Sequence, residues 1–197
     1  MRLTLFLLMM LFSGHHNQLE NKKKWVIDSS SKLLIHGNTN VNSFTCTMNC
    51  YSNSDTLEYV LNESSCNIIF SKNVMVVPIE YFNCGSEMIT KDFWATVKSD
   101  EFPNMKIRFL TLNDFHGPST INPISGKVTI SLAGVEKTFN VMYNVETNSG
   151  RLVTLKGNQL VCFSDFELKA PKKMFGLIQV QENLKVEFHL RLRTINS

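Results

Sequence analysis

The sequence predicts an antiparallel β-barrel or β-sandwich that carries one helix. Short runs of alternating apolar and polar side chains recur from residue 25 onward, turn signals separate these runs, and a single segment has helical spacing. Consecutive hairpins with one apolar face leave edges that must be paired or covered, and closure of the sheet does this most completely. A closed barrel of roughly eight to ten strands is therefore favoured.

The composition fits one globular domain. The chain has 197 residues, of which 43% are hydrophobic and 19% charged, so a sizeable core can form. The formal net charge of +3 is weak and gives no sign of the basic face that nucleic-acid binding needs. We therefore expect no nucleic-acid partner.

The N-terminus has the layout of a secretory signal peptide. Arg2 precedes an apolar run over residues 3–12 that is too short to span a bilayer, and Ser13 and Gly14 supply small residues for cleavage. The alternative is a buried N-terminal strand or helix. We predict a signal peptide over residues 1–14, a polar tail over 15–24, a barrel domain over 25–197, a periplasmic or secreted location and no transmembrane span.

Five cysteines in an exported chain favour a disulfide, and the odd number leaves at least one thiol. Residues 51–65 are interpreted as a polar loop joining a strand at 46–48 to a strand at 66–70, which places Cys50 opposite Cys66. We predict a Cys50–Cys66 disulfide, worth about 3 kcal/mol on the loop-entropy model. A zinc site is disfavoured, because the sequence has no C-x2-C pair and its histidines are scattered.

The next segments are a covered strand and the helix. Residues 74–82 are apolar on both faces, and Pro78 suits a strand end or a bulge. Ser86 can cap a helix over residues 86–99, and Pro103 requires that helix to have ended. Its apolar stripe is wide enough to cover a barrel mouth, as a fixed plug or as a moving lid, and the spacing favours the plug. The stripe consists of Ile89, Phe93, Trp94 and Val97.

Strand patterns follow the helix. Residues 105–112 alternate, and residues 127–145 form a hairpin around a turn at Ala133 and Gly134. Residues 184–192 show the clearest period-two alternation in the chain. This pattern is typical of a strand with one face in a core and the other in water.

A turn is predicted in the stretch before that last strand. Residues 151–168 contain two runs divided at Gly157 and Asn158, which we interpret as a turn.

The sequence contains no familiar catalytic motif. It has no G-x-S-x-G elbow, no phosphate-cradling glycine loop and no HExxH pair. Asp165 lies between Phe163 and Phe166, where a buried carboxyl group could act as an acid or base. An aspartate that binds nearby backbone amides is the more common arrangement. We therefore predict a binding protein with no catalytic residues, no metal and no cofactor.

Four segments, in order, resemble the YceI-like family, the lipid- or polyisoprenoid-binding domain of exported bacterial proteins. The resemblance runs from about Trp25 to Arg193 and is strongest to the branch common in Bacteroidetes-type bacteria. The segments are IHGNTNVNSFTCTM (35–48), the block VVPIEYFNCGSEMITKDFWATVKSDEFPNMKIRF (76–109), the hairpin VTISLAGVEKTFNV (128–141) and the closing block FSDFELKAPKKMFGLIQVQENLKVEFHLRL (163–192).

The resemblance implies an all-β, antiparallel, eight-stranded, lipocalin-like extended barrel with one helix packed near the barrel opening. Its interior would hold a long-chain amphipathic lipid: an isoprenoid quinone, a polyprenyl chain, or a fatty acid or amide. Two departures put ligand selectivity in question more than the fold. The family's Arg-Asp-x-His-Leu helix motif is Lys91-Asp92-Phe93-Trp94-Ala95 here, and the usual glycine of the closing motif is Glu167.

The same alternation selects the residues expected to line the lipid cavity. They are Ile107, Phe109, Val128, Ile130, Phe139, Val141, Tyr143, Phe188 and Leu190, with Phe93, Trp94 and Phe102 at the cavity mouth. The Tyr143 hydroxyl could meet a lipid head group. Filled and hollow barrels use the same alternation, so barrel core is an equal alternative for each residue.

Two other functions stay open at this point. One is a filled-barrel structural or interaction protein of the envelope. The other, less favoured, is an enzyme acting on the bound lipid through Asp165 or His116. A homodimer is also compatible with the sequence.

Overall fold

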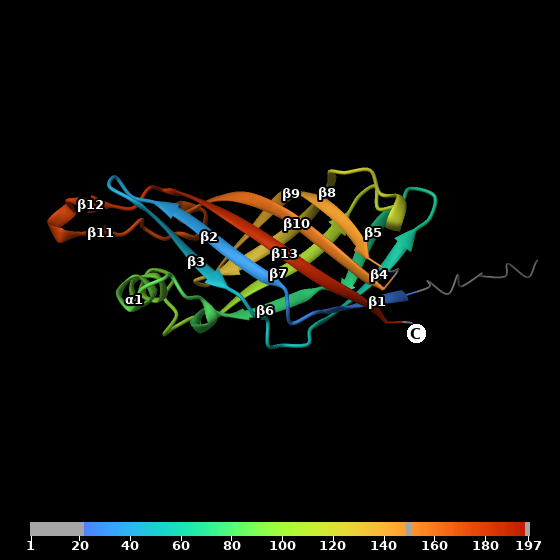
Figure 1. Ribbon diagram of the computed structural model, residues 1–197, viewed down its shortest axis with the longest axis horizontal. Helices are drawn as coiled ribbons and strands as arrows, with labels where there is room; N and C mark the ends of the chain where they lie inside the picture. The colour runs from blue at the N-terminus through green and yellow to red at the C-terminus, as the bar shows by residue number, and fades with distance from the viewer. Residues whose placement is uncertain (1–21, 149–150, 196–197) are drawn as a thin grey trace, which may run out of the picture.

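The computed structural model describes residues 22–148 and 151–195, which form an antiparallel barrel closed by eight strands (Figure 1). Each strand pairs with the next, and the last pairs with the first. The predicted eight-stranded antiparallel barrel is thus confirmed. The order around the barrel is β1 (Lys22–Ile27), β4 (Thr56–Asn62), β5 (Asn67–Lys72), β7 (Asn104–Leu112), β8 (Ile124–Leu132), β9 (Val135–Asn148), β10 (Leu152–Cys162) and β13 (Asn183–Ile195).

Three further strands lengthen the sheet toward one end. β2 (Lys32–Asn38) pairs with β13, β3 (Ser43–Met48) pairs with β2, and β6 (Val74–Pro78) pairs with β7. β11 (Lys172–Lys173) and β12 (Ile178–Gln179) form a small separate hairpin. The short 3-10 helices are η1 (Ile79–Tyr81), η2 (Gly117–Ser119), η3 (Phe163–Phe166) and η4 (Met174–Gly176).

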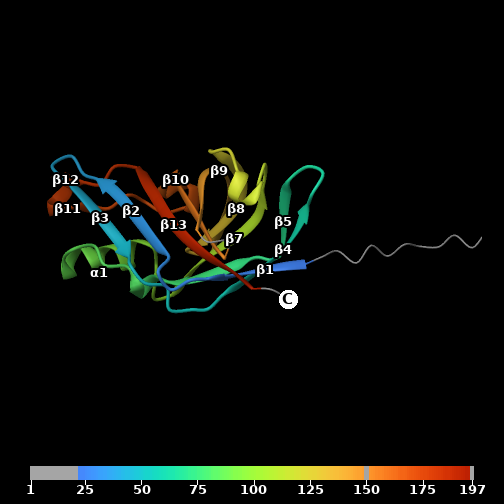
Figure 2. The same ribbon diagram turned by 45° about the vertical axis from the view of Figure 1, so that its right-hand side comes forward.

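The two ends of the barrel differ. α1 (Glu87–Thr96) and the β11–β12 hairpin lie at one end, which we call the helix end, whereas β1 and the β4–β5 turn lie at the opposite, far end (Figures 1 and 2). β7 starts close to α1 and runs away from it toward the far end (Figure 1). The loop from β7 to β8 therefore lies at the far end. Among the described residues, no helix is both long and apolar enough to cross a bilayer.

The N-terminal boundary of the barrel differs from the predicted one. The predicted signal peptide, residues 1–14, lies outside the described residues, as does the predicted tail up to residue 21. Lys22, Lys23 and Lys24, which the sequence places in the polar tail, form the start of β1 and pair with β4. The backbone hydrogen bonds between β1 and β4 continue from Trp25 back to Lys22, because β4 is long enough to pair with these residues through Val60.

Aromatic side chains fill the far half of the barrel. The Trp25 ring lies 4.3 Å from the Tyr59 ring and 5.6 Å from the Phe115 ring, and Phe70 lies 5.9 Å from Phe109. All five side chains are buried. Burial of large aromatic rings contributes much of the hydrophobic stabilisation of such a core. Buried aromatic rings in contact with each other therefore occupy this half of the barrel.

The helix forms where its signals predict it. The Ser86 hydroxyl accepts a hydrogen bond from the Ile89 amide at 3.3 Å, which satisfies one of the free amides at the helix start. α1 ends at Thr96, a few residues short of the predicted 99, because the chain turns before Pro103. Phe93 anchors the helix to the barrel through Phe82, with the two rings 5.4 Å apart.

The predicted hairpin is confirmed, whereas the second predicted turn is wrong. Ala133 and Gly134 form the turn between β8 and β9, both with positive φ, as a two-residue hairpin turn requires. Gly157 lies within the uninterrupted strand β10. A Cβ there would lie 2.5 Å from the carbonyl oxygen of Met142 and 2.5 Å from the ring of Phe188. The glycine thus marks a close approach of a side chain to a strand.

The predicted disulfide pairs the wrong cysteines. Cys46 bonds to Cys84, while Cys50 and Cys66 are free. The strand containing Cys46 pairs with β2 and not with residues 66–70, which form a hairpin with β4. Thr47 and Asn83 exchange two backbone hydrogen bonds of 2.8 and 3.1 Å, so the neighbouring cysteines form a non-hydrogen-bonded pair, where side chains lie closest.

Candidate functional site

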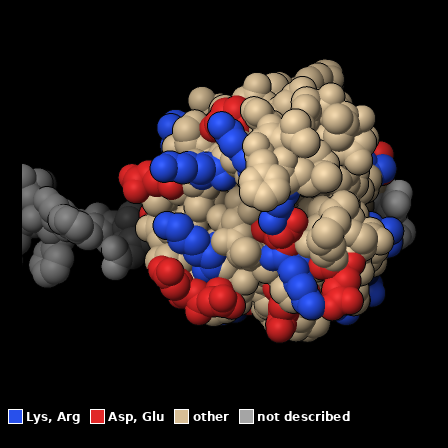
Figure 3. All heavy atoms as spheres, turned by 90° about the vertical axis from the view of Figure 1, so that its left-hand side faces the viewer, with Lys and Arg blue, Asp and Glu red and all other residues tan. Residues whose placement is uncertain are grey.

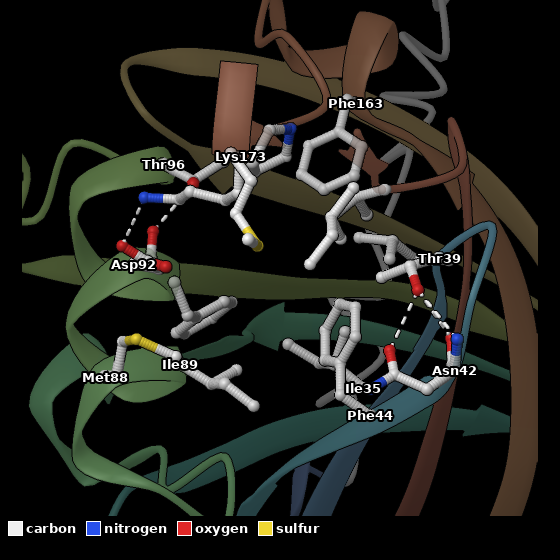
Figure 4. A pocket seen from close by; sticks show the side chains of 16 residues that line it. Ile35, Thr39, Asn42, Phe44, Met88, Ile89, Asp92, Thr96, Phe163 and Lys173 are labelled. Carbon is white, nitrogen blue, oxygen red and sulfur yellow. Dashed lines mark hydrogen bonds and ion pairs between the residues drawn. The ribbon is translucent and has the colours of Figure 1, made fainter. Parts of the chain in front are cut away.

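A cavity of about 420 Å³ lies at the helix end, between the barrel, α1 and the β11–β12 hairpin (Figure 4). Its volume falls within the range of roughly 300–1,000 Å³ that is usual for small-molecule sites. α1 contributes Met88, Ile89, Asp92, Phe93 and Thr96; the β2–β3 region contributes Ile35, Thr39, Asn42 and Phe44; the segment from η3 to β13 contributes Phe163, Pro171, Lys173, Met174, Ile178, Val180 and Leu184.

The few polar groups of this lining are bonded to each other. Lys173 Nζ lies 2.6 Å from Asp92 Oδ1, and the Thr96 hydroxyl donates to the Asp92 backbone carbonyl at 2.7 Å (Figure 4). Across the cavity, the Thr39 hydroxyl donates to Asn42 Oδ1 at 2.8 Å. The remaining lining is apolar or aromatic except for the backbone. The site is therefore suited to an apolar chain with a polar group at one end.

A smaller cavity of about 60 Å³ lies next to the larger one. Four side chains line both cavities: Ile35, Phe93, Phe163 and Leu184. The rest of the smaller lining consists mainly of buried barrel and loop residues such as Val97 and Phe166. The shared side chains thus separate an outer cavity from an inner pocket within the barrel.

The β11–β12 hairpin is attached unequally on its two sides. On the β2–β3 side, Asn40 Nδ2 donates to the Leu177 carbonyl at 2.9 Å, and the Gln179 amide donates to Asn40 Oδ1 at 2.9 Å. On the α1 side, the ion pair between Lys173 and Asp92 is the hydrogen-bonded contact found within the described ranges. The hairpin is therefore held firmly on its β2–β3 side and weakly on its α1 side.

We expect Asp92→Asn to loosen the α1 edge of the hairpin. Exposed ion pairs contribute about 0–1 kcal/mol, so the global stability should change by less than about 1 kcal/mol. Amide hydrogen exchange across residues 172–179 should nevertheless speed up, because opening of a weakly held segment is local. Lys91→Gln is the matched control, since it breaks the pair between Lys91 and Glu87 within α1 alone. Equal exchange in both variants would contradict the role given to Asp92.

No model of a known protein family matches this chain, and no curated protein matches it either. Solved structures do match. A polyisoprenoid-binding domain from Saccharophagus degradans, implicated in plant cell wall breakdown, aligns with a TM-score of 0.63 at 12% identity, covering 87% of this chain and 98% of that one.

Two further structures agree with the first. BcnA of Burkholderia cenocepacia aligns with a TM-score of 0.63 at 15% identity, over 84% of this chain and 98% of its own. The YceI protein of Campylobacter jejuni aligns with a TM-score of 0.52 at 14% identity, over 71% and 81%. This chain has the YceI fold. The resemblance seen in the sequence is confirmed at the level of the fold, and the assignment to a Bacteroidetes-type branch stays a prediction.

The YceI barrel places most of the residues expected to line a cavity in its packed core. None of them lines the larger cavity, and Ile130 alone among them lines the smaller one. Tyr143, whose hydroxyl was expected to meet a head group, is 1% exposed, and burial raises its pKa. The others outside both cavities are Ile107, Phe109, Val128, Phe139, Val141, Phe188 and Leu190.

The predicted mouth residues separate into two groups. Phe93 lines both cavities. Trp94 and Phe102 line neither: Trp94 packs against the core with its indole nitrogen buried and without a partner among the described residues, and Phe102 lies over the β8–β9 turn, close to Gly134. In the helix stripe, Ile89 and Phe93 face the larger cavity, whereas Val97 faces the inner pocket.

The residues that the sequence did not indicate come mainly from irregular segments. Thr39 and Asn42 lie in the β2–β3 turn, and Pro171, Met174 and Val180 lie in or beside the β11–β12 hairpin. These segments have no periodicity that could be assigned to an inward face. Their one usable signal was the cluster of apolar residues in MFGLIQV, which is unusual for a surface loop.

The two residues considered for catalysis lie outside both cavities. His116 is exposed in the loop between β7 and β8, at the far end. Asp165 accepts a hydrogen bond from the Cys162 amide at 2.9 Å and pairs with Lys137 at 3.3 Å. Asp165 thus holds the backbone at the end of β10, which is the more common arrangement expected for it.

Proposed function

We propose that this chain is a non-catalytic binding or carrier protein for a long-chain amphipathic lipid, acting in the periplasm. Isoprenoid quinones, polyprenyl chains and fatty acids or amides are the candidate ligands. The observation that carries the proposal is the apolar cavity of about 420 Å³ at the helix end, whose few polar side chains are already paired with each other. The polyisoprenoid-binding domain with the same fold supports the lipid class.

The aromatic packing of the barrel supports one way of holding the ligand. The far half of the barrel is filled by aromatic side chains, so the apolar chain enters from the helix end and ends near Phe93 and Phe163. A long polyprenyl chain therefore enters by one end, with the rest of its length outside the cavity. A ligand short enough to fit the cavity, such as a fatty acid, places its head group near Asp92 and Lys173, the charged pair of the lining.

A chain-length series tests the proposal. Each methylene transferred from water to an apolar site contributes about 0.8 kcal/mol, which is about a fourfold gain in affinity. Fatty acids of increasing length that compete with a fluorescent fatty-acid probe should therefore bind more tightly with each methylene, until the cavity is full and the affinity levels off. No saturable binding at any length would favour the filled-barrel structural protein, which the packed far half already suits.

Ile178→Trp should weaken probe binding at least tenfold. Ile178 is half-buried and lines the larger cavity, so an indole ring there would take up space that the apolar chain needs. Ile69→Trp is the matched control, because Ile69 is 60% exposed on β5 and lines neither cavity. Equal probe affinity in both variants would show that the probe binds elsewhere.

A further inference from the structure

Five large apolar side chains are exposed together at the helix end. Phe175 is fully exposed, and the other four are more than 60% exposed. We call this set the rim: Val41, Met88, Met174, Phe175 and Leu177. The upper right of this end is a broad area without charged side chains, bordered by lysines, arginines and carboxylates (Figure 3).

The rim surrounds the opening of the larger cavity. Met88 and Met174 line the cavity and are also exposed, at 72% and 63%. Leu177 is joined to the β2–β3 turn by the hydrogen bond from Asn40 to its carbonyl. The three segments that carry the rim, namely that turn, the start of α1 and the hairpin tip, therefore border one opening.

The hairpin tip holds its apolar side chains outward. Met174, Phe175 and Gly176 have φ values of +50°, +54° and +90°, a conformation that bulky residues rarely adopt. Exposure of a whole phenylalanine ring to water is unfavourable in free energy. Contiguous apolar patches on a protein surface mark interaction sites. A strained tip that presents Phe175 to the outside favours an interaction surface at this end of the barrel.

We infer that the rim docks on a lipid bilayer and opens the cavity directly to it. This inference rests on the proposed function. Since Met88 and Met174 belong both to the rim and to the cavity lining, an apolar chain would pass from bilayer to cavity without crossing water. Lys169 and Lys172, exposed just before the hairpin tip and without an ion pair in the described part of the chain, would attract anionic head groups.

A second copy of the chain fits the rim less well. A symmetric pair would place the lysine-bearing faces of both copies in one interface, where like charges repel. Such a pair would also close the opening through which a lipid must enter. A lipid surface has neither disadvantage.

Co-sedimentation with vesicles tests the inference. The chain without its predicted signal peptide, residues 15–197, should bind phosphatidylcholine vesicles and should bind more tightly when phosphatidylglycerol is included. The double variant Phe175→Ser/Leu177→Ser should lose at least about tenfold in vesicle binding, because these side chains supply the apolar area for insertion. Ile121→Ser is the control: Ile121 is 84% exposed but lies in the far-end loop between β7 and β8.

A soluble fluorescent fatty-acid probe separates this inference from the proposed function. Phe175 and Leu177 line neither cavity, so the double variant should keep its affinity for the probe. A wild-type chain that binds the probe but not vesicles would overturn docking and leave the carrier function standing. A chain that binds vesicles but no probe would overturn the carrier function and the lipid passage inferred from it. A dimer in light scattering that the double variant dissociates would show a second copy on the rim and overturn docking.

Discussion

Replacing both Cys46 and Cys84 by alanine is expected to lower the free energy of unfolding by about 4 kcal/mol. The disulfide closes a loop of 38 residues, and the loss of loop-closure entropy in the unfolded chain gives this magnitude. The bond also joins β3 to the segment between β6 and α1. Because that segment leads into the helix that borders the cavity, the helix end should loosen before the far end.

Urea unfolding under non-reducing conditions measures this effect. Alanine is preferred to serine, because both sulfur atoms are buried and a hydroxyl there would lose its hydrogen bonds to water. Cys50→Ala is the matched control, since Cys50 is exposed and free, and its unfolding midpoint should not move. A double variant as stable as the wild type would show that the bond constrains nothing, and a thiol assay finding five free thiols would show that it is absent.

Phe93→Ala is expected to change both stability and ligand choice. Phe93 packs on Phe82, and truncation of a large aromatic side chain in such a position costs about 3 kcal/mol. Phe93 also lines both cavities, so its removal joins the inner pocket to the outer cavity. The chain length at which fatty-acid affinity levels off should then increase by one or more methylenes. Competition titrations on the variant and the wild type measure that shift.

Trp94→Ala is the matched control on the same helix. Trp94 packs against the core and lines neither cavity, so stability should fall while the preferred chain length stays the same. Unchanged lipid release from this variant would mean that α1 is a fixed plug. Faster release would mean that α1 moves as a lid. An equal change in chain-length preference in both variants would contradict the separating role of Phe93.

The fold was largely predictable because its signals are local. The alternation in β13 and the Ala133–Gly134 turn depend on residues close in sequence, and both were found where predicted. The turn predicted at Gly157 was wrong because glycine is favoured both in turns and where another side chain comes close to the backbone. Here it is the second case: Phe188, from a strand far away in the sequence, lies close to Gly157. The disulfide prediction was wrong for a related reason. The pairing of the cysteines depends on how the chain returns to β3 after β6, and this contact joins residues far apart in the sequence.

The site was less predictable than the barrel. The alternation of inward-facing apolar side chains does not distinguish a packed half of a barrel from a half that holds a cavity. Here the cavity is formed by a helix, a turn and a hairpin added to the barrel. Glu167 illustrates what the resemblance adds. It stands where the resemblance to the YceI-like family implies a glycine, and its φ of +55° is one that glycine adopts freely. The backbone conformation is kept although the residue differs.

The separation of a packed far half from a hollow helix end has an evolutionary consequence. Mutations in the β2–β3 turn or the hairpin tip alter the cavity without touching the aromatic core, so new ligand preferences can arise at little cost to folding. On the proposed function, this chain can change what it binds while its barrel stays intact. Solved structures align over most of the chain at only 12–15% identity, so the barrel itself is compatible with wide differences in sequence.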